Sequence, residues 1–194
     1  MAGHFEATPG GGAAVALDEV EIAILRSLAV QLLELIGPGD EPAEGEDPLA
    51  ALFAEGPSEP PTDPALARLF PEAYGDGDDE LRAASAEFRR FTENDLRTRK
   101  REDALVVVRT LDALTPAGDG AAVLTLTADE CRNWLGSLND LRLTIGTRLD
   151  VSDEDEGEEG SLYRLPDSDP RKPMVMAYLW LGALQETLVE TMMS

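Results

Sequence analysis

Apolar residues recur at helical spacing in four segments of the chain, 18–36, 79–114, 127–149 and 173–193. Intervals of three and four residues place the apolar side chains of a segment on one face of a helix. Helices with such faces pack around a shared core, so the pattern predicts a bundle of about four principal helices. In 18–36 the apolar positions surround nearly the whole helix, and we therefore expect this helix in the middle of the bundle.

The segment 79–114 carries two apolar stripes separated by a polar midsection in which Leu96 is the one apolar residue. Either one long helix has an exposed midsection, or two helices meet near 92–95, and we prefer the single helix. We expect the first stripe to pack into the core. It comprises Leu81, Ala84, Phe88 and Phe91. The second comprises Leu105, Val108 and Leu111.

Two short apolar runs, 12–17 and 120–126, share one arrangement, because each leads into a helix through a capping box. The boxes are Asp18 with Glu21 and Thr127 with Glu130. An isolated strand would leave its backbone groups unpaired, so we expect the two runs to form a two-stranded sheet. Chance similarity of two capped helices is the alternative explanation.

The connections differ in composition from the helices. Residues 37–79 hold eight of the thirteen prolines and six glycines, which is typical of a flexible insertion. Within it, 47–53 and 63–70 each begin Asp-Pro, which favours two short helical turns. We expect a loose tail at 1–11 and an acidic loop at 150–170, where every position from 153 to 159 except Gly157 is acidic.

Together these segments predict a mainly α, single-domain fold over 1–194. It consists of about four principal helices, a small two-stranded β element and a long insertion rich in proline, glycine and acids. A chain of 194 residues is long enough to bury a substantial core.

Charge divides the chain unevenly. The formal net charge is −23, yet seven of the sixteen basic residues lie between 82 and 101, against three acids, which leaves that stretch at about +4. Its most basic part is Arg97, Arg99, Lys100 and Arg101. Three interpretations remain open for these four residues: a solvated helix face, a docking site for the protein's own acidic loops, or a surface that binds an acidic protein or nucleic acid. The overall acidity disfavours direct DNA binding.

The inventory of reactive side chains argues against an enzyme. His4 is the single histidine and Cys131 the single cysteine, so a Cys–His zinc site, a His-based triad and an internal disulfide are all excluded. We expect no cofactor and no metal. On its helix Cys131 shares the apolar face, which favours a buried, inert thiol; its place near the helix N-terminus favours a reactive redox thiol.

The segment 173–193 has two interpretations as well. It is either a core helix or, with its methionines and two large aromatic residues, a seam for a homodimer. The N-terminus lacks the features of a signal peptide, and the uncharged run 174–184 is too short to cross a bilayer. We therefore expect a cytoplasmic protein.

Four segments, taken together and in order, resemble an actinobacterial family long catalogued only as a domain of unknown function. They are 63–74 (DPALARLFPEAY), 87–97 (EFRRFTENDLR), 139–149 (NDLRLTIGTRL) and 176–181 (MAYLWL). One branch of this AosR-like family is described as an oxidative-stress transcriptional regulator, and the glycine- and alanine-rich opening resembles streptomycete members. The resemblance implies a non-enzymatic cytoplasmic regulator that contacts the transcription machinery in redox stress.

The redox interpretation in that family rests on a closely spaced cysteine pair in one branch. Here Cys131 stands alone, with Leu135 four residues further on, so an internal disulfide switch does not transfer. The leading hypothesis is a regulator that uses Arg97, Arg99, Lys100 and Arg101 toward its partner. The alternative is a homodimeric adaptor joined through 173–193.

Overall fold

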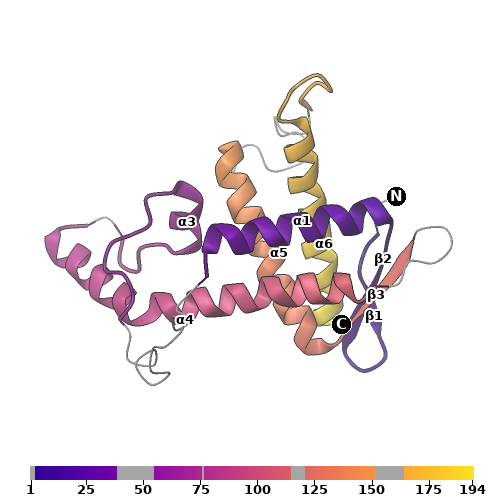
Figure 1. Cartoon of the computed structure of the whole chain (residues 1–194), viewed down its shortest axis with the longest axis horizontal. Helices are drawn as coiled ribbons and strands as arrows, with labels where there is room; N and C mark the ends of the chain where they lie inside the picture. Colours follow the sequence, from indigo (N-terminus) through magenta and orange to yellow (C-terminus); the bar gives the residue numbers. More distant parts are fainter. Residues whose placement is uncertain (1–2, 39–54, 76, 115–120, 152–163) are drawn as a thin grey trace.

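Two pairs of helices cross each other in the computed structural model, and a small sheet lies at one end (Figure 1). The structure describes residues 3–38, 55–75, 77–114, 121–151 and 164–194. One pair is α1 (Glu19–Ile36) with α4 (Asp79–Asp112), and the other is α5 (Ala128–Leu149) with α6 (Lys172–Met193). The predicted mainly α fold with four principal helices is confirmed, and 79–112 forms a single helix.

Both capping boxes are present. The Asp18 carboxylate accepts from the Glu21 N–H at 2.8 Å, and the Glu21 carboxylate accepts from the Asp18 N–H at 2.9 Å. At α5 the Thr127 hydroxyl accepts from the Glu130 N–H at 3.3 Å, and the Glu130 carboxylate accepts from the Thr127 N–H at 2.8 Å. These bonds satisfy N–H groups that the helix itself leaves unpaired, so they fix where α1 and α5 begin.

The two predicted strands pair with each other. β2 (Gly12–Leu17) and β3 (Ala122–Leu126) are antiparallel, with Val15 opposite Leu124. Alternate side chains of both strands face the helices and are buried, as the two-residue period of a strand requires. The sheet has a third strand, β1 (Glu6–Thr8), on the other edge of β2.

The expectation of a loose tail at 1–11 is wrong from Phe5 onward. Gly10 and Gly11 adopt φ values of +108° and +84°, which glycine accepts readily, and they form the turn that folds β1 back onto β2. The Phe5 ring is buried against Trp134, edge to face at 6.1 Å, and the Phe5 N–H donates to the Thr187 hydroxyl at 3.1 Å. Gly10 and Gly11 therefore mark the turn of a hairpin.

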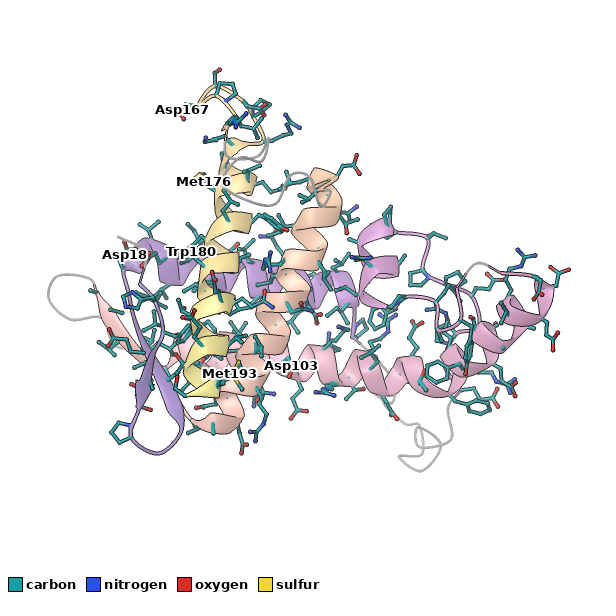
Figure 2. All side chains as sticks on the ribbon, turned by 180° about the vertical axis from the view of Figure 1, so that it is seen from behind. Asp18, Asp103, Asp167, Met176, Trp180 and Met193 are labelled. Atoms are coloured by element: carbon teal, nitrogen blue, oxygen red, sulfur yellow. The ribbon has the colours of Figure 1, made fainter. Side chains whose placement is uncertain are left out.

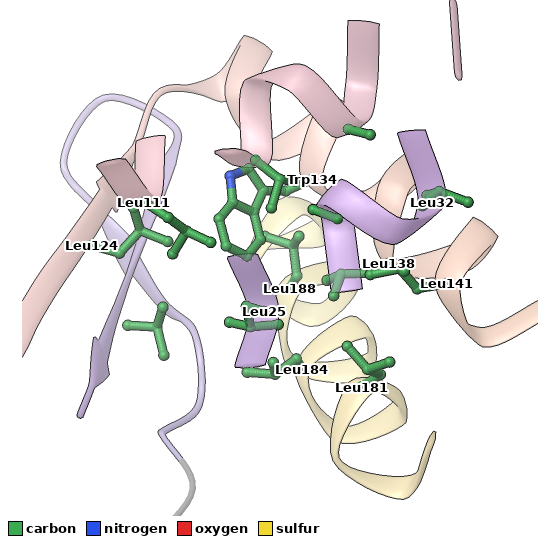
Figure 3. Packing of buried hydrophobic residues seen from close by; sticks show 14 of the residues in the cluster. Leu25, Leu32, Leu111, Leu124, Trp134, Leu138, Leu141, Leu181, Leu184 and Leu188 are labelled. Atoms are coloured by element: carbon green, nitrogen blue, oxygen red, sulfur yellow. The ribbon is translucent and has the colours of Figure 1, made fainter. Parts of the chain in front are cut away.

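One core lies between the helices and the inner face of the sheet (Figure 3). Trp134 is completely buried at its centre, and its indole N–H donates to the Thr110 hydroxyl at 3.0 Å. Leucines from α1, α4, α5, α6 and β3 surround the ring. Aromatic residues are few in this chain, so branched aliphatic side chains supply most of the packing.

The position of α1 differs from the expectation. One side of α1 packs on α4 and α5 through Leu25, Ala29 and Leu32, but Val20 and Ile24 on the other side are exposed. The helix therefore lies across the outside of the bundle and not in its middle. The narrow polar stripe of the helix, Ser27, Gln31 and Glu34, continues the line of Val20 and Ile24 at three- and four-residue intervals and is exposed with them, so it marks the uncovered side.

Residues 55–75, from the segment expected to be flexible, are held against the helices. The predicted turn at 63–70 is α3 (Pro64–Leu69), capped by Asp63 and followed by a buried Phe70. Asp63 also accepts from Arg148 of α5 at 2.7 Å. The other predicted turn, 47–53, and the acidic run 153–159 lie outside the described residues.

Candidate functional site

The N-terminal half of α4 turns a polar face toward the rest of the molecule. Ser85, Arg89 and Glu93 follow one another at intervals of four residues and are buried, Arg89 being 5% and Glu93 3% exposed. Such spacing stacks side chains along one side of a helix. Charged groups this deeply buried require partners, because desolvation of an unpaired charge is costly.

The partners lie in the irregular segment 70–74 and on α4 itself. Arg89 donates to the Phe70 carbonyl at 3.1 Å, to Glu93 at 2.7 Å and to Glu72 at 3.2 Å. The Ser85 hydroxyl accepts from the Tyr74 N–H at 3.1 Å. A segment that is neither helix nor strand presents backbone groups that need hydrogen bonds when covered, and the polar face of α4 supplies them.

Two further arginines of α4 reach the end of α1. Arg97 donates to the Ile36 carbonyl, and Arg101 donates to the carbonyls of Gly37 and, at 3.4 Å, Leu33. The last turn of α1 contains no basic residue of its own. Because the C-terminal end of a helix carries partial negative charge, these guanidinium groups stabilise it from the neighbouring helix.

Arg97 also connects this contact to the buried pair. It donates to Glu93 at 2.7 Å, and its guanidinium lies 4.5 Å from the centre of the Phe70 ring. Glu93 therefore bridges Arg89 and Arg97. We refer to Arg89, Glu93 and Arg97 as the ionic ladder of α4.

A second polar cluster joins α4 to α5, where Asp103 is labelled in Figure 2. Lys100 donates to Asp140 at 2.6 Å, and Asn133 donates to Asp103 at 2.8 Å. Burial raises the pKa of Asp140, opposed by its hydrogen bond and charge attraction to Lys100. Burial also raises the pKa of Asp103, opposed first by the hydrogen bond from Asn133.

The structure thus corrects the expectation that the basic run is an exposed surface. Arg97, Lys100 and Arg101 bond inside the molecule, and of the four only Arg99 is exposed. Among the described residues, Arg101 reaches Gly37 at the start of the predicted 37–79 insertion, and the acidic run 153–159 lies outside the described residues. The basic residues are concentrated here because helix ends, loop carbonyls and buried carboxylates meet along this side of α4.

The opposite side of α4 is apolar and uncovered. Phe91 is 60% and Phe88 48% exposed, and Leu81 is exposed two turns before Phe88. Leu96 is exposed at the border with the polar face, two turns after Arg89. Tyr74 packs edge to face on Phe88 at 6.1 Å. We call Tyr74, Leu81, Phe88, Phe91 and Leu96 the aromatic surface. Beside it, a pocket of about 190 Å³ lies between the 70–73 segment and α4, with Phe88 and Leu96 in its wall.

The expectation that the stripe of Leu81, Ala84, Phe88 and Phe91 packs into the core is therefore wrong. Sequence reasoning assumed that the apolar side of a helix is the buried side. A signal for the true orientation exists in the opposite charges of Arg89, Glu93 and Arg97 at four-residue intervals. From the sequence alone, however, Glu93 and Arg97 at this spacing are equally compatible with a solvated helix face.

Cys131 lies in the core, 1% exposed. Burial raises the pKa of its thiol, while a hydrogen bond with the Ala13 backbone acts in the opposite direction. The thiolate is the reactive form of cysteine, so this environment disfavours reaction with oxidants. The structure favours the inert thiol over the redox thiol.

The apolar middle of α6 faces this chain's own core. Val175, Leu181 and Leu188 are buried there. The large apolar side chains that α6 exposes are methionines near its two ends: Met174, Met176, Met192 and Met193. Figure 2 shows Met176 and Met193 far apart along the helix. A continuous seam along 173–193 is thus not available on the surface.

No group of three or more His, Cys, Asp or Glu side chains among the described residues is placed to hold a metal ion. Within the same residues, no helix has both the length and the hydropathy to cross a bilayer.

The fold and these contacts define a small helical domain whose buried ionisable groups bond to one another and to the backbone. Residues 2–192 match the model of the family described as domain of unknown function DUF2017, and the chain belongs to that family. This confirms the family resemblance of the four segments. No solved structure matches the chain.

Named relatives come from mycobacteria. A Mycobacterium tuberculosis protein (strain H37Rv) named "Oxidative stress regulator AosR" is 29% identical over 184 residues, covering 89% of this chain and 78% of that protein. The Mycobacterium bovis protein of the same name gives the same figures. A Mycobacterium leprae protein to which the same name is given provisionally is 30% identical over 188 residues. The match covers 90% of this chain and 79% of the Mycobacterium leprae protein. These names are those of regulators, not of enzymes.

The ionic ladder makes a prediction about stability. Replacing Glu93 by Ala leaves Arg89 and Arg97 buried without their shared carboxylate, and we expect the free energy of unfolding to fall by about 3–5 kcal/mol. Glu87→Ala, an exposed glutamate of the same helix, should change it by no more than about 0.5 kcal/mol. Urea unfolding of the two variants measures both. Equal effects would show that the ladder is solvated.

Asp103 makes a prediction about pH. Its pKa in the folded protein is raised above the unfolded value, so the unfolded state loses its proton first as pH increases. This carboxyl therefore lowers stability progressively from about pH 4 upward, until the folded-state pKa is passed. The stability of the wild type minus that of Asp103→Asn should fall over this range and then level off. Urea unfolding at several pH values measures the difference, and a difference that rises with pH contradicts the assignment.

Proposed function

We propose that this protein is a non-enzymatic cytoplasmic regulator that acts by protein contacts with the transcription machinery. Three relatives named oxidative stress regulators support the regulatory role. The site of contact differs from the basic run that the sequence favoured, because most of that run bonds internally.

One observation carries the proposal: a group of aromatic and aliphatic side chains is exposed together on α4. Soluble proteins rarely leave such groups uncovered unless they bind something. Large aromatic side chains are also the residues that contribute most to protein interfaces. The contacts on the other side of α4 hold these side chains outward, so their exposure follows from the fold.

The mode of regulation that we propose does not use a disulfide within this chain. Its single cysteine is buried, and the pKa of the thiol is raised by that burial. A signal of oxidative stress would then reach this protein through its partner or through its abundance. The thiol of Cys131 would serve packing.

A homodimeric adaptor is the second candidate, and the exposed methionines of α6 are the observation in its favour. Methionine is enriched at interfaces and adapts to irregular surfaces. The seam would have to form at the ends of α6, since the middle of the helix faces the core.

Crosslinked co-purification distinguishes the two candidates. The tagged protein and its Cys131→Ser variant are expressed in an actinobacterial host, with and without oxidant, and bound proteins are identified by mass spectrometry. We expect subunits of RNA polymerase or its associated factors to be enriched over the tag alone, equally for both variants. Loss of capture in Cys131→Ser would contradict thiol-independent action. Absence of any transcription protein, together with a dimer in sedimentation, would replace the proposal by the adaptor.

A further inference from the structure

We propose that the aromatic surface of α4 binds a basic amphipathic helix of the partner. This inference rests on the proposed function for the existence of a partner, and it adds the chemistry by which that partner is recognised.

The aromatic surface is held in a fixed arrangement before any partner arrives. Tyr74 is anchored through its backbone to Ser85, and its ring rests against Phe88. The guanidinium of Arg90 lies 4.8 Å from the centre of the Phe91 ring. Side chains that are already ordered lose little conformational entropy on binding, which favours affinity.

The surface also offers a place for an anchoring side chain. Phe70, Pro71, Phe88 and Leu96 supply the apolar part of the wall of the pocket beside it. Polar side chains also line this pocket: Glu72, Ser85, Arg89, Thr92 and Glu93. An amphipathic helix presents apolar side chains at intervals of three and four residues. One of these can enter the pocket while its neighbours cover Phe88 and Phe91.

Unpaired acids flank this apolar surface. Glu87 and Asp95 lie four residues before and after Phe91, so the three side chains stand in line along α4. Glu80 lies two turns before Glu87. All three acids are exposed, and none has an ion-pair partner among the described residues. Two nearby arginines are partly neutralised, since Arg82 pairs with Asp79 and Arg90 with Glu55 at 3.5 Å. Arg99, one turn after Asp95, is exposed as well and lies at the far end of the surface from Glu80 and Glu87.

The exposed acids beside the aromatic surface favour a basic partner segment. Lysine or arginine side chains beside the apolar anchors would meet Glu87 and Asp95, and the charge of −23 would speed their approach. A second copy of this chain would bring equal negative charges together, and nucleic acid would be repelled in the same way. Protein segments with basic flanks and an apolar face fit both properties of the surface.

Synthetic helices test the chemistry directly. The probes are a fluorescent amphipathic peptide of Leu and Lys, a scrambled peptide of the same composition without an apolar face, and an amphipathic peptide of Leu and Glu. We expect the first to bind the full chain, the scrambled peptide to bind more weakly, and the acidic peptide not to bind. Fluorescence anisotropy measures the affinities, and amide NMR shifts locate the binding on α4.

Variants with matched controls assign the binding to the surface. Phe88→Ala with Phe91→Ala should weaken binding of the basic peptide by about tenfold or more, since each side chain acts as an anchor. Met176→Ala, an exposed apolar residue of α6, should leave it unchanged. If the double variant is unstable, Phe91→Ala alone, at the more exposed ring, should still weaken binding.

The acids have their own control pair. Glu87→Gln with Asp95→Asn should weaken binding and reduce its dependence on salt. Glu186→Gln with Glu190→Gln, exposed acids one turn apart on α6, should do neither.

Several results would overturn the inference. They are equal affinity of the Phe88/Phe91 and Met176 variants, equal binding of the acidic peptide, NMR shifts away from α4, or a self-association that the Phe88/Phe91 variant abolishes. The peptides contain no transcription protein. Binding to the peptides without co-purification of transcription proteins would therefore reject the proposed function and keep this inference. Co-purification of transcription proteins without binding to the peptides would keep the proposed function and reject this inference.

Discussion

The burial of Glu93 between Arg89 and Arg97 determines how the rest of α4 is oriented. A carboxylate in this position needs both guanidinium groups, and those groups in turn need the carbonyls of Phe70 and Ile36. Buried ion pairs add little stability over apolar packing, but a change that breaks one is costly. Rotating α4 so that Phe88 and Phe91 enter the interior would carry the ladder into solvent and leave those carbonyls unpaired.

This constraint connects parts of the chain that are distant in sequence. The ladder attaches the 70–74 segment to α4, Arg97 and Arg101 attach the end of α1, and Lys100 attaches α5 through Asp140. Beyond Asp103 the buried face of α4 becomes apolar, with Ala104, Val107 and Leu111 in the core. One helix therefore has two kinds of buried face, and the aromatic surface lies opposite the polar one.

The sequence was sufficient where local chemistry decides the structure. Capping boxes and apolar periodicity located all four long helices. The two apolar runs that lead into capping boxes, 12–17 and 120–126, located two strands that pair. The sequence was insufficient where the side of a helix that is buried depends on which other segment packs against it. A stripe such as Leu81 to Phe91 is buried only if another apolar face covers that side, and here an irregular segment covers the opposite one. The hairpin at Gly10 and Gly11 was missed because a three-residue strand carries almost no periodic signal.

The central claim is that α4 buries its ionic ladder and exposes its aromatic side, and the phenylalanines of this chain test it directly. Hydroxyl-radical footprinting with mass spectrometry measures the oxidation rate of each phenylalanine ring in the native protein. Phe5 and Phe70 are buried and serve as internal references of identical chemistry. The structure predicts rapid oxidation of Phe88 and Phe91 and strong protection of Phe5 and Phe70. Protection of Phe88 and Phe91 equal to that of Phe70 would contradict the orientation of α4.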